Sequence, residues 1–223
     1  MISNIEQSIT IGSQRLDCYK IINKVILYLD KIIEGFPNYL KTSNLQYEKE
    51  TLLNQYLTVY LNSQIPSEEY IETFRFTFLT EIVQEDLLNK PDIGVFLAGK
   101  LGTSKPFFHI ECKRLPARNK IYEQEYVKGH LGGIQRYKEG KHGSHFACSA
   151  MIGYIQDQNF EYWFEKINQW INDLIQLEPL FWKETDKLTE RDFTRKNKFV
   201  STHSKVNNEY IKLYHYWVSL NAN

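Results

Sequence analysis

Two carboxylates and a lysine occur where the sequence predicts two neighbouring strands. Asp92 follows Pro91 at the start of one strand, and Glu111 and Lys113 flank Cys112 in the next. Because side chains alternate faces along a strand, Glu111 and Lys113 project from one face and Cys112 from the other, apolar face. Burying charges is costly unless they are paired or bind a metal. Carboxylates that converge with a backbone carbonyl suit Mg²⁺, which lowers the pKa of a bound water, and a lysine could orient that water.

The strands that must position these residues are predicted to form a three-stranded antiparallel meander over residues 74–114. Residues 74–83 (FRFTFLTEIV) alternate aromatic and polar side chains, which is typical of a half-buried strand. A turn at residues 89–91 precedes the second strand, which starts IGVFLAG, and a loop separates it from the third, PFFHIECKRL. Asp92 is therefore expected to lie beside the strand that carries Glu111.

Apolar residues at helical spacing predict helices before and after this meander. The spacing is most regular over residues 160–177, whereas glycines interrupt the helix predicted over residues 122–137. The charge-rich residues 183–198 are expected to be exposed. The remaining expected elements are helices over residues 14–34 and 44–61, a strand over 145–155, and a closing strand pair over 198–205 and 210–220.

This order of elements predicts a mixed α/β fold with helices packed on a central sheet. With 223 residues, the chain is long enough for one domain with a full core. We expect a single domain over residues 1–223, with an N-terminal helical extension (about 1–43) and a C-terminal strand-pair extension (about 180–223).

The Pro-Asp pair ending at Asp92, followed by the Glu-Cys-Lys run over residues 111–113, resembles the signature of the PD-(D/E)xK superfamily of restriction-endonuclease-like nucleases. The resemblance implies an α/β fold with an α-β-β-β-α-β core, a mixed central sheet flanked by helices. The predicted order of elements fits that core from about residue 44 to 176. Carried over by position, Asp92 and Glu111 look like metal ligands and Lys113 like the catalytic lysine. The implied cofactor is Mg²⁺, for which Mn²⁺ can substitute.

Members of this family commonly carry a glutamate on the helix before the sheet, and that glutamate joins the metal site. Glu50 is our candidate here, because it shares a helical face with Leu53 and Leu57. Glu48 is the competing candidate.

Many members also carry a glutamine and a tyrosine on the helix after the third strand. Gln135 and Tyr137 lie in that region, at a spacing that departs from the family's usual pattern. Together with Gln135, the basic residues Arg136 and Lys128 could contact nucleic acid by tracking phosphates, and Lys138 and Lys141 belong to the same basic segment. The alternative is that these basic residues lie on a solvated helix face.

Composition restricts the other classes of function. Lys and Arg total 27 and Asp and Glu total 27, so the formal net charge is zero, which argues against a general nucleic-acid coating protein. No apolar run approaches the ~20 residues of a membrane span. The N-terminus lacks a basic region followed by an apolar stretch, and the three cysteines are widely spaced. A reduced, cytoplasmic protein without a membrane association is the simplest interpretation.

These observations predict a Mg²⁺-dependent endonuclease that hydrolyses phosphodiester bonds. The resemblance implies DNA as the substrate, because most members of the family act on it, with RNA as the alternative. By analogy with the family, we expect a role in bacterial defence against foreign or phage DNA, with a protein partner or a homodimer supplying specificity. The first alternative is a non-catalytic nucleic-acid-binding or assembly subunit of a defence complex. The second is a zinc hydrolase that uses His142 and His145, although a turn explains that pair better. Cys112 is interpreted as a core cysteine and His109 as a neighbour of the site or an exposed residue.

Overall fold

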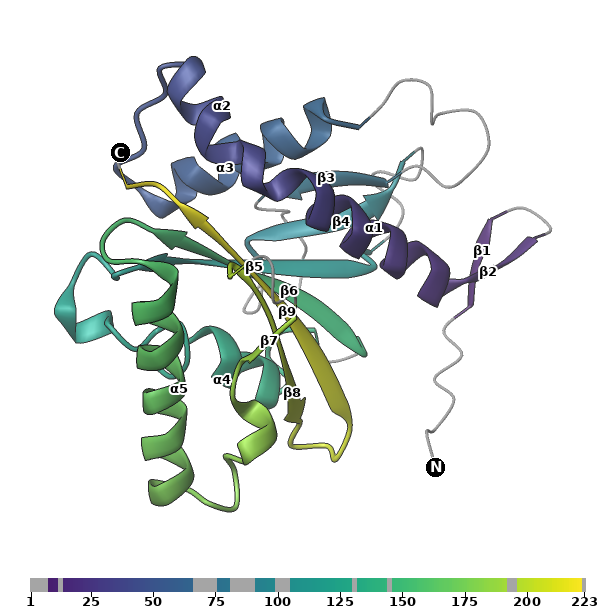
Figure 1. Ribbon diagram of the computed structural model, residues 1–223. Helices are drawn as coiled ribbons and strands as arrows, with labels where there is room; N and C mark the ends of the chain where they lie inside the picture. Colours follow the sequence, from purple (N-terminus) through teal and green to yellow (C-terminus); the bar gives the residue numbers. More distant parts are fainter. Residues whose placement is uncertain are drawn as a thin grey trace.

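A mixed seven-stranded sheet in the order β3-β4-β5-β6-β9-β8-β7 forms the centre of the structure, a computed structural model (Figure 1). The structure describes residues 8–11, 14–65, 76–80, 91–98, 105–129, 132–143, 146–191 and 196–221. The sheet strands are β3 (Phe76–Thr80), β4 (Ile93–Leu97), β5 (Phe108–Leu115), β6 (Cys148–Ile155), β7 (Thr189–Glu190), β8 (Lys198–Ser204) and β9 (Tyr210–Ser219). β6 pairs parallel with both β5 and β9, and the other neighbouring strands pair antiparallel. A separate hairpin comprises β1 (Ser8–Ile11) and β2 (Gln14–Asp17).

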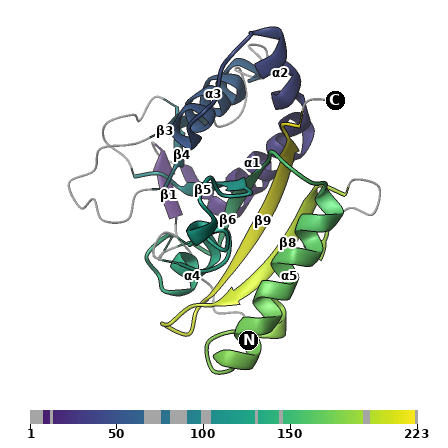
Figure 2. The same cartoon turned by 90° about the vertical axis from the view of Figure 1, so that its left-hand side faces the viewer.

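Helices cover both faces of the sheet (Figure 2). The α-helices are α1 (Cys18–Ile32), α2 (Phe36–Thr42), α3 (Glu50–Ser63), α4 (Gly133–Lys138) and α5 (Phe160–Leu177), and the short 3₁₀ helices are η1 (Ile33–Gly35), η4 (Lys120–Tyr122) and η5 (Glu184–Asp186). α1, α2 and α3 pack on one face in one hydrophobic cluster, and α4 and α5 pack on the other face in a second cluster. No described helix is long and apolar enough to cross a membrane.

The central strands are apolar on both faces because each face is covered. In β6, Ala150 and Ile152 join the cluster under α1–α3, whereas Met151 and Ile155 join the cluster under α4 and α5. Near-continuous apolar runs are typical of strands buried on both sides. The polar residues on β5 are therefore exceptions that need a partner or a function.

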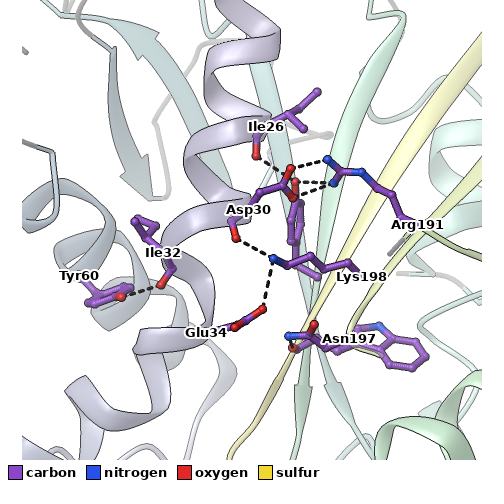
Figure 3. A network of polar contacts seen from close by, with 10 residues as sticks. Ile26, Asp30, Ile32, Glu34, Tyr60, Arg191, Asn197 and Lys198 are labelled. Atoms are coloured by element: carbon purple, nitrogen blue, oxygen red, sulfur yellow. Dashed lines mark hydrogen bonds and ion pairs between the residues drawn. The ribbon is translucent and has the colours of Figure 1, made fainter. Parts of the chain in front are cut away.

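Charged side chains from the C-terminal part of the chain hold α1 against the sheet (Figure 3). Arg191 forms a two-point ion pair with Asp30 of α1, and its guanidinium donates to the Tyr216 hydroxyl at 3.1 Å. Lys198, at the start of β8, donates to the Asp30 carbonyl at 2.6 Å and lies 3.2 Å from a carboxylate oxygen of Glu34. These contacts hold α1 against β8, β9 and Arg191.

The expected meander, the helix over residues 160–177 and the closing strand pair are confirmed. The ends of the first expected strand, residues 74–75 and 81–83, lie outside the described residues. The closing pair does not stand apart from the core, because β9 joins the central sheet beside β6.

Three helix predictions are wrong in part. The helix predicted over residues 44–61 begins only at Glu50, because Lys49 has an extended backbone. Residues 14–17 form β2 instead of the first turn of a helix, because they pair with β1 and so gain strand hydrogen bonds. The helix predicted over residues 122–137 is replaced by turns and the six-residue α4. The cause lies in the glycines: Gly129 has φ +142°, and a Cβ on Gly132 would lie 2.5 Å from one backbone atom of Lys128 and from the Gly129 nitrogen.

The prediction that residues 183–198 are exposed is also wrong for two charged residues, Asp186 and Lys198. Asp186 is wholly buried and Lys198 nearly so. Each has ion-pair partners on elements distant in the sequence, which a local charge pattern does not reveal.

Candidate active site

The candidate site lies where β4 ends beside β5. The two strands pair over three residues of each, ending with Ile93 opposite Ile110. β5 continues to Leu115, paired on its other side with β6. In the described part of the chain, the edge of β5 that faces β4 has no strand partner after Ile110. Its backbone amides are therefore available to side chains.

Two carboxylates occupy this open edge. Asp92, immediately before β4, accepts a hydrogen bond from the Cys112 amide at 2.8 Å. Glu50, the first residue of α3, accepts one from the Arg114 amide at 2.9 Å. Amides of alternate residues point to the same edge of a strand, so the two carboxylates converge on one place from different elements. Glu48 is exposed, and its backbone carbonyl accepts from the Arg114 guanidinium.

Glu111 and Lys113 lie on one face of β5, as the strand pattern predicts, and both are buried. Their relative exposures are 3% and 8%, and Lys113 Nζ donates to Glu111 Oε1 at 2.7 Å. The other carboxylate oxygen of Glu111 lies 3.5 Å from Nε2 of His142, which is also buried. Cys112 points to the opposite face and is a free, fully buried cysteine of the core.

Electrostatics show that the three carboxylates and the lysine form one group. Burial raises the pKa of Glu50 to about 7, with Asp92 adding to the rise. Burial and the negative charge of Glu111 raise the pKa of Asp92 to about 7. Burial alone would lower the pKa of Lys113, but the three carboxylates outweigh it and raise that pKa above its ordinary value. The site thus holds more negative than positive charge when all its groups are ionised.

Helix α4 brings two further residues to the site. The charge of Arg136 counteracts the rise in the pKa of Asp92, so the two residues are electrostatic neighbours. Tyr137 is fully buried, and after burial itself the largest cause of its raised pKa is the charge of Glu111. Arg136 is therefore the member of the predicted nucleic-acid contact set that lies near the carboxylates.

The other two members of that set have partners elsewhere. The side-chain oxygen of Gln135 accepts from the backbone amide of Gly129 at 3.1 Å, and its side-chain nitrogen donates to the Glu139 carboxylate at 2.7 Å. Lys128 forms an ion pair with Glu178 just beyond α5. Neither contact directs these side chains to Glu111 or Asp92, so of the three predicted residues the structure groups only Arg136 with the site.

The sequence analysis missed the position of His142. The residue follows α4, and its amide donates to the Arg136 carbonyl at 3.2 Å, which carries the ring back toward β5. The signal in the sequence is the spacing of His142 and His145, for which a turn is preferred over a zinc site. Gly143, with φ +57°, forms a turn directly after His142. His109 shares the face of Glu111 and lies against Phe146, with its pKa lowered to about 3 by burial and by His142. His145 lies outside the described residues.

The donors at the site suit a hard divalent cation. Asp92, Glu111 and Glu50 offer only carboxylate oxygens, which Mg²⁺ and Mn²⁺ prefer. The raised pKa values of Asp92 and Glu50 reflect burial together with mutual repulsion, which a bound cation would relieve. Within the described ranges, no three His, Cys, Asp or Glu side chains already form a ligand group. Glu111 is held by Lys113, so it would have to release that ammonium to bind a cation.

Comparison of the chain with protein-family models, with curated proteins and with solved structures gives no match.

Proposed function

We propose that this protein is a metal-dependent nuclease that hydrolyses phosphodiester bonds of DNA. The observation that carries the proposal is the convergence of Glu50, Asp92 and Glu111 with Lys113 beside the open edge of β5. Carboxylates that remain together despite burial and repulsion are characteristic of functional sites rather than of stable cores. The chain order α3, β3, β4, β5, α4, β6 is also the α-β-β-β-α-β order of the PD-(D/E)xK fold, which supports the same assignment.

In this proposal Asp92 and Glu111 would hold Mg²⁺, and Glu50 would complete the set. A cation held there would lower the pKa of a bound water and polarise a phosphate oxygen. Lys113, kept protonated by the carboxylates around it, donates hydrogen bonds to the attacking water or to the negative charge that develops on the phosphate. Arg136, the cation on the α4 side, contacts a phosphate of the substrate and so positions the scissile bond.

Cleavage assays test this function directly. Purified protein would be incubated with plasmid, linear and single-stranded DNA and with RNA, in Mg²⁺, in Mn²⁺ and in EDTA. We expect metal-dependent cleavage of DNA that Asp92→Ala and Lys113→Ala abolish and that Glu50→Gln reduces. Glu48→Gln is the matched control, because it neutralises an exposed carboxylate two residues from Glu50 and should cleave as wild type does. Equal cleavage by wild type and Asp92→Ala would refute the assignment.

One observation favours a second candidate, a non-catalytic nucleic-acid-binding or assembly subunit that retains the fold. Glu111 is neutralised by Lys113 at 2.7 Å, an arrangement that is complete without a metal. Mn²⁺ titration separates the two candidates. Mn²⁺ binding that Asp92→Asn eliminates supports the nuclease, whereas DNA binding without any Mn²⁺ binding supports the subunit.

We further propose that the protein acts in the cytoplasm of a bacterial cell against foreign or phage DNA, alone, as a homodimer or with a protein partner. The support is the resemblance of its site residues to those of restriction-type nucleases. Expression in a susceptible host would lower the efficiency of phage plating, and the Asp92→Ala protein would not. Equal plating with both proteins would refute a defence role for the nuclease.

A further inference from the structure

A buried chain of hydrogen bonds runs along the face of the sheet under α4 and α5. Its links are Trp217 Nε1 to the Tyr126 hydroxyl (3.0 Å), that hydroxyl to His215 Nδ1 (2.8 Å), His215 Nε2 to Ser201 Oγ (2.7 Å), Ser201 Oγ to His203 Nε2 (2.6 Å), and His203 Nδ1 to Asp186 Oδ1 (2.5 Å). All six residues are buried, and no described residue of the proposed site belongs to the chain.

The donors and acceptors in this chain of hydrogen bonds can be arranged in only one direction. The Trp217 indole is a donor only, so the Tyr126 hydroxyl accepts from it and gives its own proton to His215. A neutral His215 then carries its proton on Nε2 and donates to Ser201. At the other end the Asp186 carboxylate only accepts, so His203 carries its proton on Nδ1. Both ends give the same direction, and every proton is directed toward Asp186.

Asp186 also forms an ion pair with Lys138, the buried lysine of α4. Lys138 Nζ donates to both carboxylate oxygens of Asp186, at 2.8 and 2.7 Å, and both side chains have 0% exposure. The ammonium lies 5.0 Å from the ring centre of Phe181 and 5.1 Å from that of Trp182. The Lys183 amide adds a further hydrogen bond to the Asp186 carboxylate at 2.7 Å.

The C-terminal end of helix α4 depends on this anchor, because a helix of only six residues cannot be stable alone. Its first turn is held by backbone bonds from Gly133, Ile134 and Gln135 to the carbonyls of residues 125–127. Its last turn is held by Lys138, by a backbone bond from Val206 to the Lys138 carbonyl and by the packing of Tyr137 in the core.

Arg136, two residues before the end of the helix, accepts a hydrogen bond through its carbonyl from the His142 amide at 3.2 Å, and the His142 ring lies 3.5 Å from the Glu111 carboxylate. The charge of Arg136 also counteracts the rise in the pKa of Asp92. The placement of the Arg136 guanidinium therefore follows from where Lys138 is held.

We propose that Asp186 is a positioning residue that holds α4 through Lys138, so that Arg136 faces the site and contacts substrate phosphate. This inference rests on the proposed nuclease function and adds the device that places its phosphate contact. Lys138 and Asp186 themselves are wholly buried and do not touch DNA.

The salt dependence of DNA binding tests this role. Affinity for a short duplex would be measured by fluorescence anisotropy at several salt concentrations, with Ca²⁺ in place of Mg²⁺ to prevent cleavage. Each phosphate contact contributes about one unit to the slope of log K against log salt. We expect Arg136→Ala to reduce the slope by about one, and Lys138→Met to reduce it equally although Lys138 is buried. The double variant should show the same slope as either single variant.

Ser201→Ala is the matched structural control. It breaks the buried chain between the two histidines but leaves the Lys138–Asp186 pair in place. We expect Ser201→Ala to lower stability while keeping the wild-type salt slope. If Lys138→Met does not fold, Asp186→Glu keeps the charge and displaces the lysine, and it should reduce the slope in the same way.

The possible results separate this inference from the proposed function. A wild-type slope in Lys138→Met or Asp186→Glu, with a reduced slope in Arg136→Ala, overturns the positioning role and leaves the nuclease proposal intact. A wild-type slope in Arg136→Ala shows that this residue contacts no phosphate and also overturns the positioning role. Absence of DNA binding by the wild-type protein overturns both.

Discussion

Asp92 Oδ2 lies 2.8 Å from the backbone nitrogen of Cys112, so a side chain makes the hydrogen bond that β4 would make if it were longer. The same carboxylate is a proposed metal ligand, which gives it a structural and a chemical role. A substitution that retains the acceptor oxygen but removes the charge can separate these roles.

We therefore expect Asp92→Asn to fold at least as stably as wild type at pH 8, because the amide oxygen still accepts from Cys112 and residue 92 no longer adds a buried negative charge beside Glu111. Cleavage should be lost, and Mn²⁺ affinity should fall at least tenfold. Asp92→Ala should lose stability as well, by about 1–3 kcal/mol, because it leaves the strand amide without an acceptor. Chemical denaturation and isothermal titration measure the two effects, and equal stability of the Asn and Ala variants would contradict the structural role.

The raised pKa of Glu50 predicts a stability that depends on pH. With a folded pKa of about 7 against an ordinary 4.5, the folded protein binds the proton more tightly than the unfolded chain. Stability from this group is therefore complete below about pH 4.5 and is lost as the pH rises through 7. Glu50→Gln should be the more stable protein at pH 8 and gain little at pH 4. Denaturation at several pH values tests this, and an equal difference at pH 4 and pH 8 would refute it.

Lys113→Met removes the ammonium that neutralises Glu111. Breaking one half of a buried ion pair costs about 3–5 kcal/mol. Because the freed carboxylates bind a cation better, we expect Mn²⁺ to raise the melting temperature of Lys113→Met more than that of wild type. Cleavage should nevertheless be absent. Thermal unfolding with and without Mn²⁺ gives the comparison, and a smaller Mn²⁺ effect in the variant would show that Lys113 does not compete with the metal.

The buried histidines should show fixed tautomers. At neutral pH, long-range ¹H–¹⁵N spectra should place the proton of His203 on Nδ1 and that of His215 on Nε2, as the direction of the hydrogen-bond chain requires. Burial lowers the pKa of both rings, so protonation favours the unfolded chain. Stability from these groups is complete above about pH 6.5 and is lost as the pH falls. A proton on Nε2 of His203 would refute the proposed direction.

Arg191 should not be replaceable by lysine. Its guanidinium makes a two-point contact with Asp30 and lies 4.8 Å from the centre of the Tyr214 ring, whereas an ammonium matches neither geometry. We expect Arg191→Lys to lower the free energy of unfolding by about 1 kcal/mol, which is below the range of about 1.5–3 kcal/mol for hydrogen bonds to charged groups, because the pair is partly exposed. Lys196→Arg, an exposed position nearby, is the control. Equal stability of Arg191→Lys and wild type would show that the positive charge alone is sufficient.

The sequence predicts this fold best where structure is local. In β5, the alternation of Phe108, Ile110 and Cys112 with Glu111 and Lys113 identifies both the strand and the face that carries the charges. Helix α5 is equally clear, because its apolar residues repeat at helical spacing and its N-cap, Asn159, accepts from the Tyr162 amide. Both patterns depend on neighbours within a few residues.

Contacts between segments that are distant in the sequence cannot be predicted from such local patterns. Asp186 belongs to a charged stretch that suggests a solvated loop, yet it is buried because Lys138 and His203 meet it there. The sequence around His142 predicts only a turn, whereas the structure shows its ring 3.5 Å from the Glu111 carboxylate. Arg136 and Gln135 are adjacent in sequence, and only the packing of α4 shows that the first lies near the carboxylates.

The position of β9 has a consequence for how the protein is made. β6, which supports the site strand, lies between β5 and β9, and α1 is fastened to β8 and to Arg191. The ribosome synthesises α1 and β5 before β8 and β9, so these early segments cannot form their native long-range contacts until the later strands have been synthesised. We therefore expect a nascent chain to remain without a completed sheet, and without a working site, until residues 210–219 have emerged.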